Sequence, residues 1–143
     1  MSSVVRRVPA RVRAFVGVVG LSVGSAASLA AQATTTIGTT SVGNPVLLET
    51  KSVKTGADGI ITATVRARFL KPIKAGASEY RASRTIAMFN CTTAKVAVKE
   101  NWYYSDEKGT KVAQHKVVGI PGYGVTIKGS LPDVAMAHLC RKQ

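Results

Sequence analysis

Acidic residues are scarce in this chain of 143 residues, which has 7 Asp and Glu against 20 Lys and Arg. Asp58, Asp106 and Glu107 lie in segments typical of turns, and Asp133 lies where a helix is expected to begin. Glu100 stands in a predicted strand beside aromatic residues but has no acidic neighbour there. The sequence therefore does not indicate a glycosidase, which would need two carboxylates at a set distance.

The chain also lacks the short motifs of common catalytic and cofactor sites. It has no phosphate-binding loop, dinucleotide fingerprint, HExxH zinc motif or GxSxG nucleophile motif. A zinc site could draw on Cys91, His115, His138 and Cys140, but His138 and Cys140 are two positions apart in a predicted helix and point in different directions. We expect no enzyme activity, no cofactor and no metal site.

Long hydrophobic runs are limited to residues 14–30, where Gly17, Gly20 and Gly24 interrupt the run. A membrane-spanning helix needs about 20 predominantly apolar residues, so this run favours a signal peptide over an anchor. Four arginines precede it, and Ala31 and Ala33 follow it with the small-x-small spacing that signal peptidase cuts. We expect residues 1–33 to be a signal peptide and the mature chain to be exported without a transmembrane anchor.

Only two cysteines are present, which excludes a disulfide-rich scaffold. Neither lies near the expected cleavage site, so no lipid anchor is expected there. In an exported chain two cysteines favour one disulfide, Cys91 to Cys140. Closing a loop of about 50 residues contributes about 4 kcal/mol in the chain-entropy account. The bond would tie the end of the chain to a strand that ends at Cys91.

Alternation of apolar and polar residues predicts a sheet. It is strictest in residues 60–69, where Ile61, Ala63 and Val65 share one face and Arg66 and Arg68 share the other. Similar patterns predict further strands at residues 44–54, 83–91, 94–104 and 110–118, with a short edge strand at 125–128. Residues 34–43 are expected to be a flexible lead-in, and residues 70–80 a loop. Residues 44–143 then form a single domain.

The last segment changes to a helical period. Ser130 is a predicted N-cap, with Asp133 three residues later in a near capping box. Leu131, Leu139 and Cys140 fall on the apolar side of the predicted helix, so this side is expected to pack on the sheet. The fold class is therefore α+β: a single antiparallel sheet of about five to six strands, with one C-terminal helix on a face and one disulfide.

The densest aromatic stretch lies in residues 94–104. Its larger apolar residues share one parity, and the polar ones share the other: Val96, Val98, Trp102 and Tyr104 against Lys95, Lys99, Asn101 and Tyr103, with an irregularity near Ala97. This pattern predicts that Trp102 and Tyr104 fill the core and that Tyr103 points outward as a contact residue.

Positive charge is the most conspicuous surplus. Four of the 20 basic residues precede residue 34, so the mature chain keeps 16 against 7 acids, a formal charge of +9. Such a field favours anionic partners, but the bases form no run of five or six, which argues against a dedicated nucleic-acid site. We expect adjacent strands to present a positive strip with Tyr103, made of Arg66, Arg68, Lys95, Lys99, Lys111 and Lys116.

The order of these features resembles the surface-adhesin protein E family of small exported proteobacterial domains. The resemblance covers roughly residues 44–140, and its motifs are Asn90 with Cys91, the aromatic hairpin of residues 102–109, Pro121 with Gly122, Ser130, and Cys140. It implies a sheet with one terminal helix tied by Cys91–Cys140, and adhesion to host surfaces. Two features depart from the family: the lipidation cysteine is absent, and Tyr123 stands where many members have Trp.

Two functions remain open from the sequence. The first is an exported, non-enzymatic, adhesin-like binding domain that contacts acidic ligands: a host extracellular-matrix or serum glycoprotein, or an anionic envelope glycan. The second is a periplasmic structural or envelope-maintenance protein without a host ligand, which the missing lipidation site favours. Both place the protein in the periplasm or on the cell surface of a Gram-negative bacterium.

Overall fold

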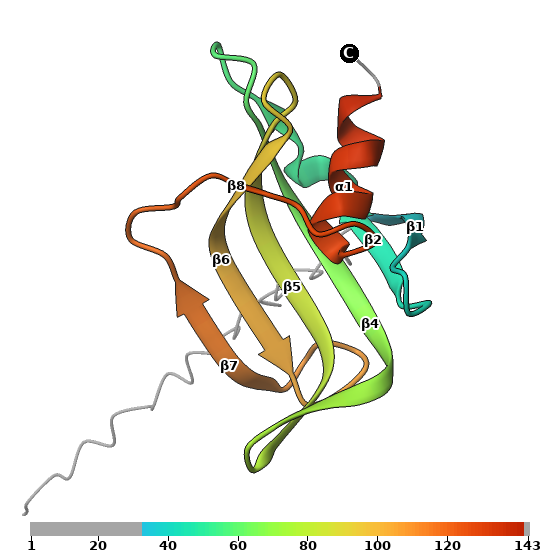
Figure 1. Cartoon of the computed structure of the whole chain (residues 1–143). Coiled ribbons are helices and arrows are strands. Elements are labelled where there is room, and N and C mark those ends of the chain that lie inside the picture. The colour runs from blue at the N-terminus through green and yellow to red at the C-terminus, as the bar shows by residue number, and fades with distance from the viewer. Residues whose placement is uncertain (1–32, 142–143) are drawn as a thin grey trace, which may run out of the picture. The chain divides into compact units, whose positions relative to one another are not determined.

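The computed structural model describes residues 33–141, so the expected signal peptide lies outside the described residues apart from Ala33. The described part holds one antiparallel sheet, a short 3-10 helix η1 (Thr50–Ser52) and a C-terminal helix α1 (Leu131–Cys140) (Figure 1). The strands are β1 (Thr34–Thr39), β2 (Pro45–Glu49), β3 (Lys54–Thr55), β4 (Ile61–Ala75), β5 (Ser78–Asn90), β6 (Lys95–Tyr104), β7 (Val112–Val117) and β8 (Gly124–Val125). They run in the order β1-β2-β4-β5-β6-β7, with β3 paired to β4 and β8 paired to β6.

The antiparallel sheet, the C-terminal helix and the disulfide are confirmed, but the strand count was wrong, because the described sheet has eight strands. Part of the difference is β1, which occupies the segment expected to be a flexible lead-in. Threonine and isoleucine favour extended backbone, and Ile37 packs against the core of the sheet and helix. β1 pairs with β2 through a bulge near Gly38, where a Cβ would lie 2.8 Å from Val134 of α1. Glycine thus allows the strand and the helix to approach closely.

The loop expected at residues 70–80 is instead the end of a long hairpin. β4 continues to Ala75 and β5 begins at Ser78, with Gly76 in the left-handed region at φ +61°. Pro72 falls within an irregularity in the β4–β5 register, between Arg68 and Ile73. A proline without an N–H is tolerated there because regular pairing is interrupted, so Pro72 does not end the strand.

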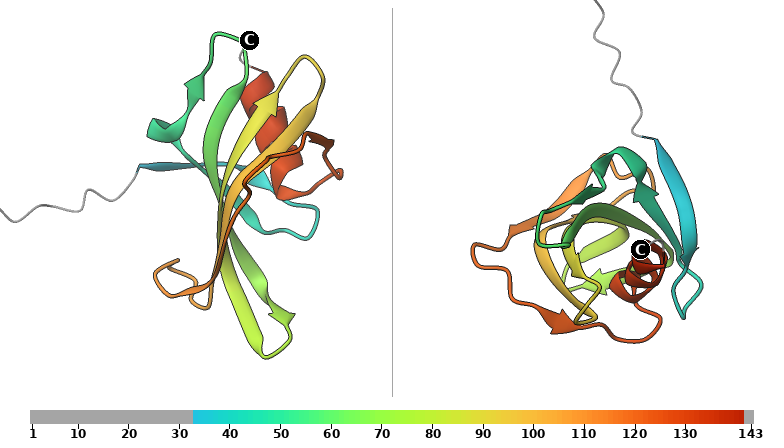
Figure 2. Two further views of the ribbon diagram at one scale, coloured as in Figure 1. Left: turned by 90° about the vertical axis from the view of Figure 1, so that its left-hand side faces the viewer. Right: turned by 90° about the horizontal axis from the view of Figure 1, so that it is seen from above.

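The core lies between α1 and one face of the sheet. Alternate residues of β4, including Ile61, Ala63 and Val65, are buried there with Phe89 of β5 and Leu139 of α1. Seen from above, the sheet curves around the helix (Figure 2). The alternation expected for residues 60–69 is therefore confirmed, and it identifies the face that carries α1. The intervening residues of β4, from Thr62 to Arg68, point to the opposite face of the sheet.

The disulfide Cys91–Cys140 joins the residue after β5 to the last residue of α1, with an S–S distance of 2.07 Å and a sequence separation of 49. It fastens the helix to the sheet beside Phe89 and Val96, which belong to or pack against the core. A helix of ten residues is short for independent stability, so the covalent link and the buried side chains together hold it in place.

The start of α1 differs in detail from the expected capping box. Ser130 occupies the N-cap position, but its hydroxyl makes no cap hydrogen bond. Asp133 instead accepts hydrogen bonds from the Gly129 N–H at 2.8 Å and from the Thr126 hydroxyl at 2.9 Å. These bonds, that from Gly129 first, lower the pKa of Asp133. Asp133 therefore stabilises the turn before the helix and does not form a capping box with Ser130.

Candidate functional site

A bulge in β6 decides which aromatic residues face the core. The β5–β6 register shifts between Ile86 and Ala87, which leaves Lys99 without a partner in β5. Val98, before the shift, lies on the helix face opposite Ala87, whereas Trp102, after it, pairs with Arg84 on the other face. The expectation that Trp102 and Tyr104 fill the core was wrong for Trp102, because one extra residue reverses the parity of the strand, whereas Tyr104 is buried at 7% exposure.

The face away from α1 carries a row of side chains that crosses five strands. In the register, Leu47 of β2 lies opposite Arg66 of β4, which is followed by Arg84 of β5, Trp102 of β6 and His115 of β7. Directly opposite residues in antiparallel strands have neighbouring side chains on the same face. The row thus brings two arginines, an indole and an imidazole together from distant parts of the sequence.

Glu49 is the buried charge at one end of this row. Its side chain is only 3% exposed, and its Oε1 accepts hydrogen bonds from Arg66 Nε at 2.6 Å and Arg84 Nε at 2.8 Å. Arg84 Nη2 adds a third bond to Oε2 at 3.1 Å. Burial alone would raise the pKa of Glu49, but the hydrogen bonds and charges of Arg84 and Arg66 outweigh it and lower that pKa. Glu49 stays ionised and fixes both arginines.

Trp102 is held between neighbours on the two adjacent strands. The His115 ring stacks on it with centroids 4.6 Å apart, and the Arg84 guanidinium carbon lies 4.9 Å from the indole centroid. His115 Nε2 is also 3.6 Å from Glu100 Oε2. These stacking and cation–π contacts occupy the indole and make Trp102 a structural link between the arginine pair and the sheet edge.

Tyr103 is engaged in a second stack. Its ring lies 4.7 Å from that of Tyr80, centroid to centroid, and the Tyr80 hydroxyl donates a hydrogen bond to Gln114 at 3.1 Å. Tyr103 is half-buried rather than fully outward. Its role as a contact residue stays a prediction, and the stack gives it a packing role as well.

The remaining residues expected to bind do not form one strip. Arg68, Lys95, Lys99, Lys111 and Lys116 are all exposed, while Arg66 is half-buried against Glu49. The register places Arg68 and Lys95 on the face away from α1, but at opposite ends of it, eight positions apart along β5, or roughly 25 Å. Lys116 pairs with Asn101 on the helix side. The cations are therefore distributed around the sheet.

The acids and the lysines behave differently throughout the described chain. Each acid has a polar partner within the fold: Glu49 with its arginines, Glu79 and Glu107 with Arg81, Glu100 with His115, and Asp58, Asp106 and Asp133 with backbone N–H groups. Within residues 33–141, four contacts between an acid and a cation use arginine, and the fifth acid–base contact joins Glu100 to His115. The lysines of residues 33–141 are all exposed and none of them makes an ion pair.

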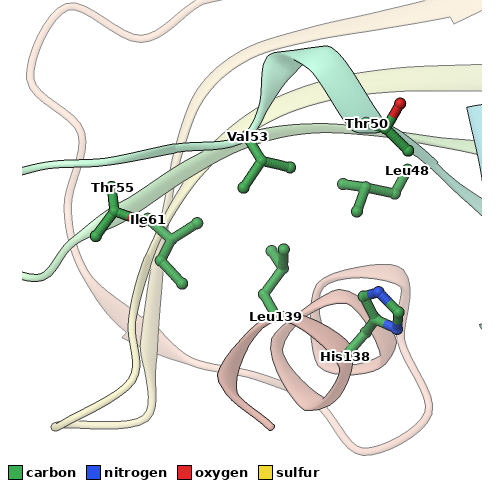
Figure 3. Close-up of a pocket in the computed structure, with 7 residues that line it drawn as sticks. All are labelled: Leu48, Thr50, Val53, Thr55, Ile61, His138 and Leu139. Atoms are coloured by element: carbon green, nitrogen blue, oxygen red, sulfur yellow. The ribbon is translucent and has the colours of Figure 1, made fainter. Parts of the chain in front are cut away.

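A pocket of about 300 Å³ lies on the helix side of the sheet. In Figure 3, Leu48, Val53 and Ile61 lie opposite Leu139, and His138 lies beside Leu139 on α1. Its lining residues are Leu48, Thr50, Val53, Thr55, Ile61, His138 and Leu139. The lining is mostly apolar and contains no carboxylate or thiol, so the pocket offers room for a small apolar group but no acid–base pair.

Cofactor and membrane features can be stated for residues 33–141 alone. In that range no group of three His, Cys, Asp or Glu side chains is arranged to hold a metal ion. No helix there is long and apolar enough to cross a membrane. The charged groups of the described surface are exposed ammonium groups and acids that already have polar partners.

Comparison with known proteins yields weak structural likeness. No family model and no curated protein matches the sequence, so membership of the surface-adhesin protein E family stays a prediction. Two solved structures of Haemophilus influenzae protein E are similar at 11% identity and a TM-score of 0.44, over 68% of this chain and 77% or 74% of theirs. At this level of similarity the comparison assigns neither ligand nor activity, so both must come from the residues of this chain.

Proposed function

We propose that this protein is an exported, non-enzymatic, adhesin-like binding domain whose ligands are acidic. The proposed ligands are a host extracellular-matrix or serum glycoprotein, or an anionic glycan of the envelope. One observation carries the proposal: each acid of the described chain has a polar partner in the same chain, whereas the lysines of residues 33–141 are exposed and make no ion pair.

This arrangement leaves the positive charge available to a partner. Ammonium groups without intramolecular partners can approach an anionic surface without first breaking an ion pair. The distribution of Arg68, Lys95 and Lys111 over the sheet and its loops suits a long, flexible polyanion better than a small ligand, because no single pocket collects them. Arg66 and Arg84 are not proposed as principal contacts, since both already donate hydrogen bonds to Glu49.

Neutralising these cations should weaken binding to a polyanion. We expect the triple variant Arg68→Gln, Lys95→Gln and Lys111→Gln to bind immobilised heparin at least about tenfold more weakly, because each lost charge removes part of the attraction. Surface plasmon resonance at low and high salt measures this, with neutral dextran as the blank. The matched control replaces Lys51, Lys54 and Lys74, which are equally exposed.

Equal losses in the two triple variants would show that net charge alone attracts heparin and would contradict these residues as contacts. If the wild-type protein does not bind heparin even at low salt, the proposal that its ligands are acidic is contradicted. Unfolding curves of each variant exclude loss of fold, which is not expected for exposed side chains.

Protease accessibility on intact cells separates the adhesin from the periplasmic alternative. We expect digestion of the protein on intact cells of its native host, because an adhesin must reach the outer surface. Cells lysed before digestion provide the control. Protection until lysis would end the adhesin proposal and favour an envelope-maintenance role.

A further inference from the structure

The segment of residues 117–127 exposes more large apolar side chains than any comparable stretch of the described chain. Nine large hydrophobic residues are exposed in residues 33–141, and five of them lie here: Val117, Ile120, Tyr123, Val125 and Ile127. Ile120 is 92% exposed and Ile127 is 80% exposed, so neither contributes to the core. This 117–127 segment presents apolar surface that the fold itself does not use.

The segment lies along the outer edge of the sheet. It runs from the last residue of β7 through β8 toward α1; β7 and β8 both pair with β6, and Figure 1 shows the chain between these two strands standing away from the sheet. Both ends of the loop between β7 and β8 are fixed: the Val118 N–H donates to the Lys99 carbonyl at 2.8 Å, and Val125 pairs with Lys95. Gly119, Pro121 and Gly122 occupy the protruding part. Of the five apolar residues, Ile120 and Tyr123 lie on this anchored loop, Val117 and Val125 lie at its two ends in β7 and β8, and Ile127 follows β8.

Positive charge surrounds the segment. Lys116 and Lys128 flank it in sequence, and Lys95 and Lys99 lie beside it in β6. Two acids lie nearby: Glu100, opposite Val117, faces His115, and the carboxylate of Asp133 accepts hydrogen bonds from Thr126 and Gly129 and also attracts Lys128. Exposed apolar side chains surrounded by lysines are complementary to a surface that has an apolar interior below an anionic outer layer.

We propose that the 117–127 segment docks the protein on an anionic lipid surface, with Ile120 and Ile127 entering the acyl region and the lysines contacting the headgroups. Buried apolar area and attraction to anionic lipids are the two terms that set such interfacial binding. A protein partner would favour a packed, continuous patch. Separate side chains on and beside a protruding loop can instead enter a fluid interface without a matching surface, and tyrosine, here Tyr123, is common at headgroup depth.

Flotation with lipid vesicles tests the proposal. Soluble protein is recovered after export in a Gram-negative host, and mass spectrometry checks that every variant has the same N-terminus. We expect binding to vesicles of phosphatidylcholine with phosphatidylglycerol, and much weaker binding to phosphatidylcholine alone.

Two double variants separate the apolar from the charged contribution. Ile120→Ser with Ile127→Ser should weaken vesicle binding by about 100-fold, because two isoleucines that enter the acyl region are lost. Lys116→Gln with Lys128→Gln should weaken it by about tenfold or more at low salt and little at high salt.

The matched control is Val42→Ser with Leu70→Ser, which removes two apolar side chains that are 74% and 64% exposed elsewhere on the chain. It should bind vesicles as the wild type does. The proposal is overturned if the wild-type protein does not bind anionic vesicles, or if the isoleucine variant binds them as strongly as the wild type does. Concentration-dependent self-association that the isoleucine variant loses, without vesicle binding, would instead assign the segment to a second copy. Heparin binding of that variant should be unchanged, which keeps this test separate from the proposed function.

Discussion

Replacing Cys91 and Cys140 together with serine is expected to lower the free energy of unfolding by about 4 kcal/mol. The two residues are 49 positions apart, so the bond removes the entropy of a long loop from the unfolded chain. A domain of this size has a net stability of roughly 5–15 kcal/mol, so this loss is a large share of it. Urea unfolding followed by circular dichroism measures the change, which should appear as a lower midpoint.

The loss should be greatest where the bond fastens α1. Ala135, Met136 and Leu139 bury themselves against the sheet, but α1 is a ten-residue helix near the end of the chain. Hydrogen exchange should therefore accelerate in α1 before it does in β4 and β5. Wild-type protein unfolded under reducing conditions provides the control and should match the double serine variant. An unchanged midpoint would show that the core alone holds the helix.

Much of this arrangement can be predicted from local patterns. Alternation in residues 60–69 predicts which side of β4 faces the core, because a one-residue slip would expose Ile61, Ala63 and Val65 together. The helical period and the position of Cys140 predict the packing face of α1. Both are short-range signals, and the structure confirms both.

Features that depend on pairing between strands could not be predicted in the same way. β1 has no strong pattern of its own and becomes a strand because β2 offers it an edge. The bulge at Lys99 leaves only an irregular alternation in the sequence, yet it moves Trp102 to the opposite face. Glu49 and Arg84 are 35 positions apart, so neither composition nor spacing marks them as an ion pair. The cations were recognisable in the sequence, but their distribution around the sheet follows only from its register.

Replacing Glu49 with glutamine is expected to lower the free energy of unfolding by about 3 kcal/mol. Removing one member of a buried ion pair leaves the other charge poorly compensated, which costs about 3–5 kcal/mol. The lower end applies because the side chains of Arg66 and Arg84 keep 30% and 20% exposure. Urea unfolding near neutral pH measures the change. Glu79→Gln is the matched control, because its pair with Arg81 is 41% exposed on both sides and should contribute less than about 1 kcal/mol.

The acid side of the stability profile tests the same ion centre. Hydrogen bonds from the arginines outweigh burial and hold the pKa of Glu49 below 4.5 in the folded protein, so the folded state binds its proton less readily than the unfolded chain does. The stability that Glu49 contributes is therefore complete above about pH 4.5, the ordinary carboxyl value, and is lost as the pH falls through the folded pKa. Asp106 and Asp133, whose pKa values are also lowered, act equally in wild type and variant. The gap between wild type and Glu49→Gln should consequently narrow on acidification, whereas a gap that stays constant below pH 4.5 would contradict an ionised Glu49 as its source.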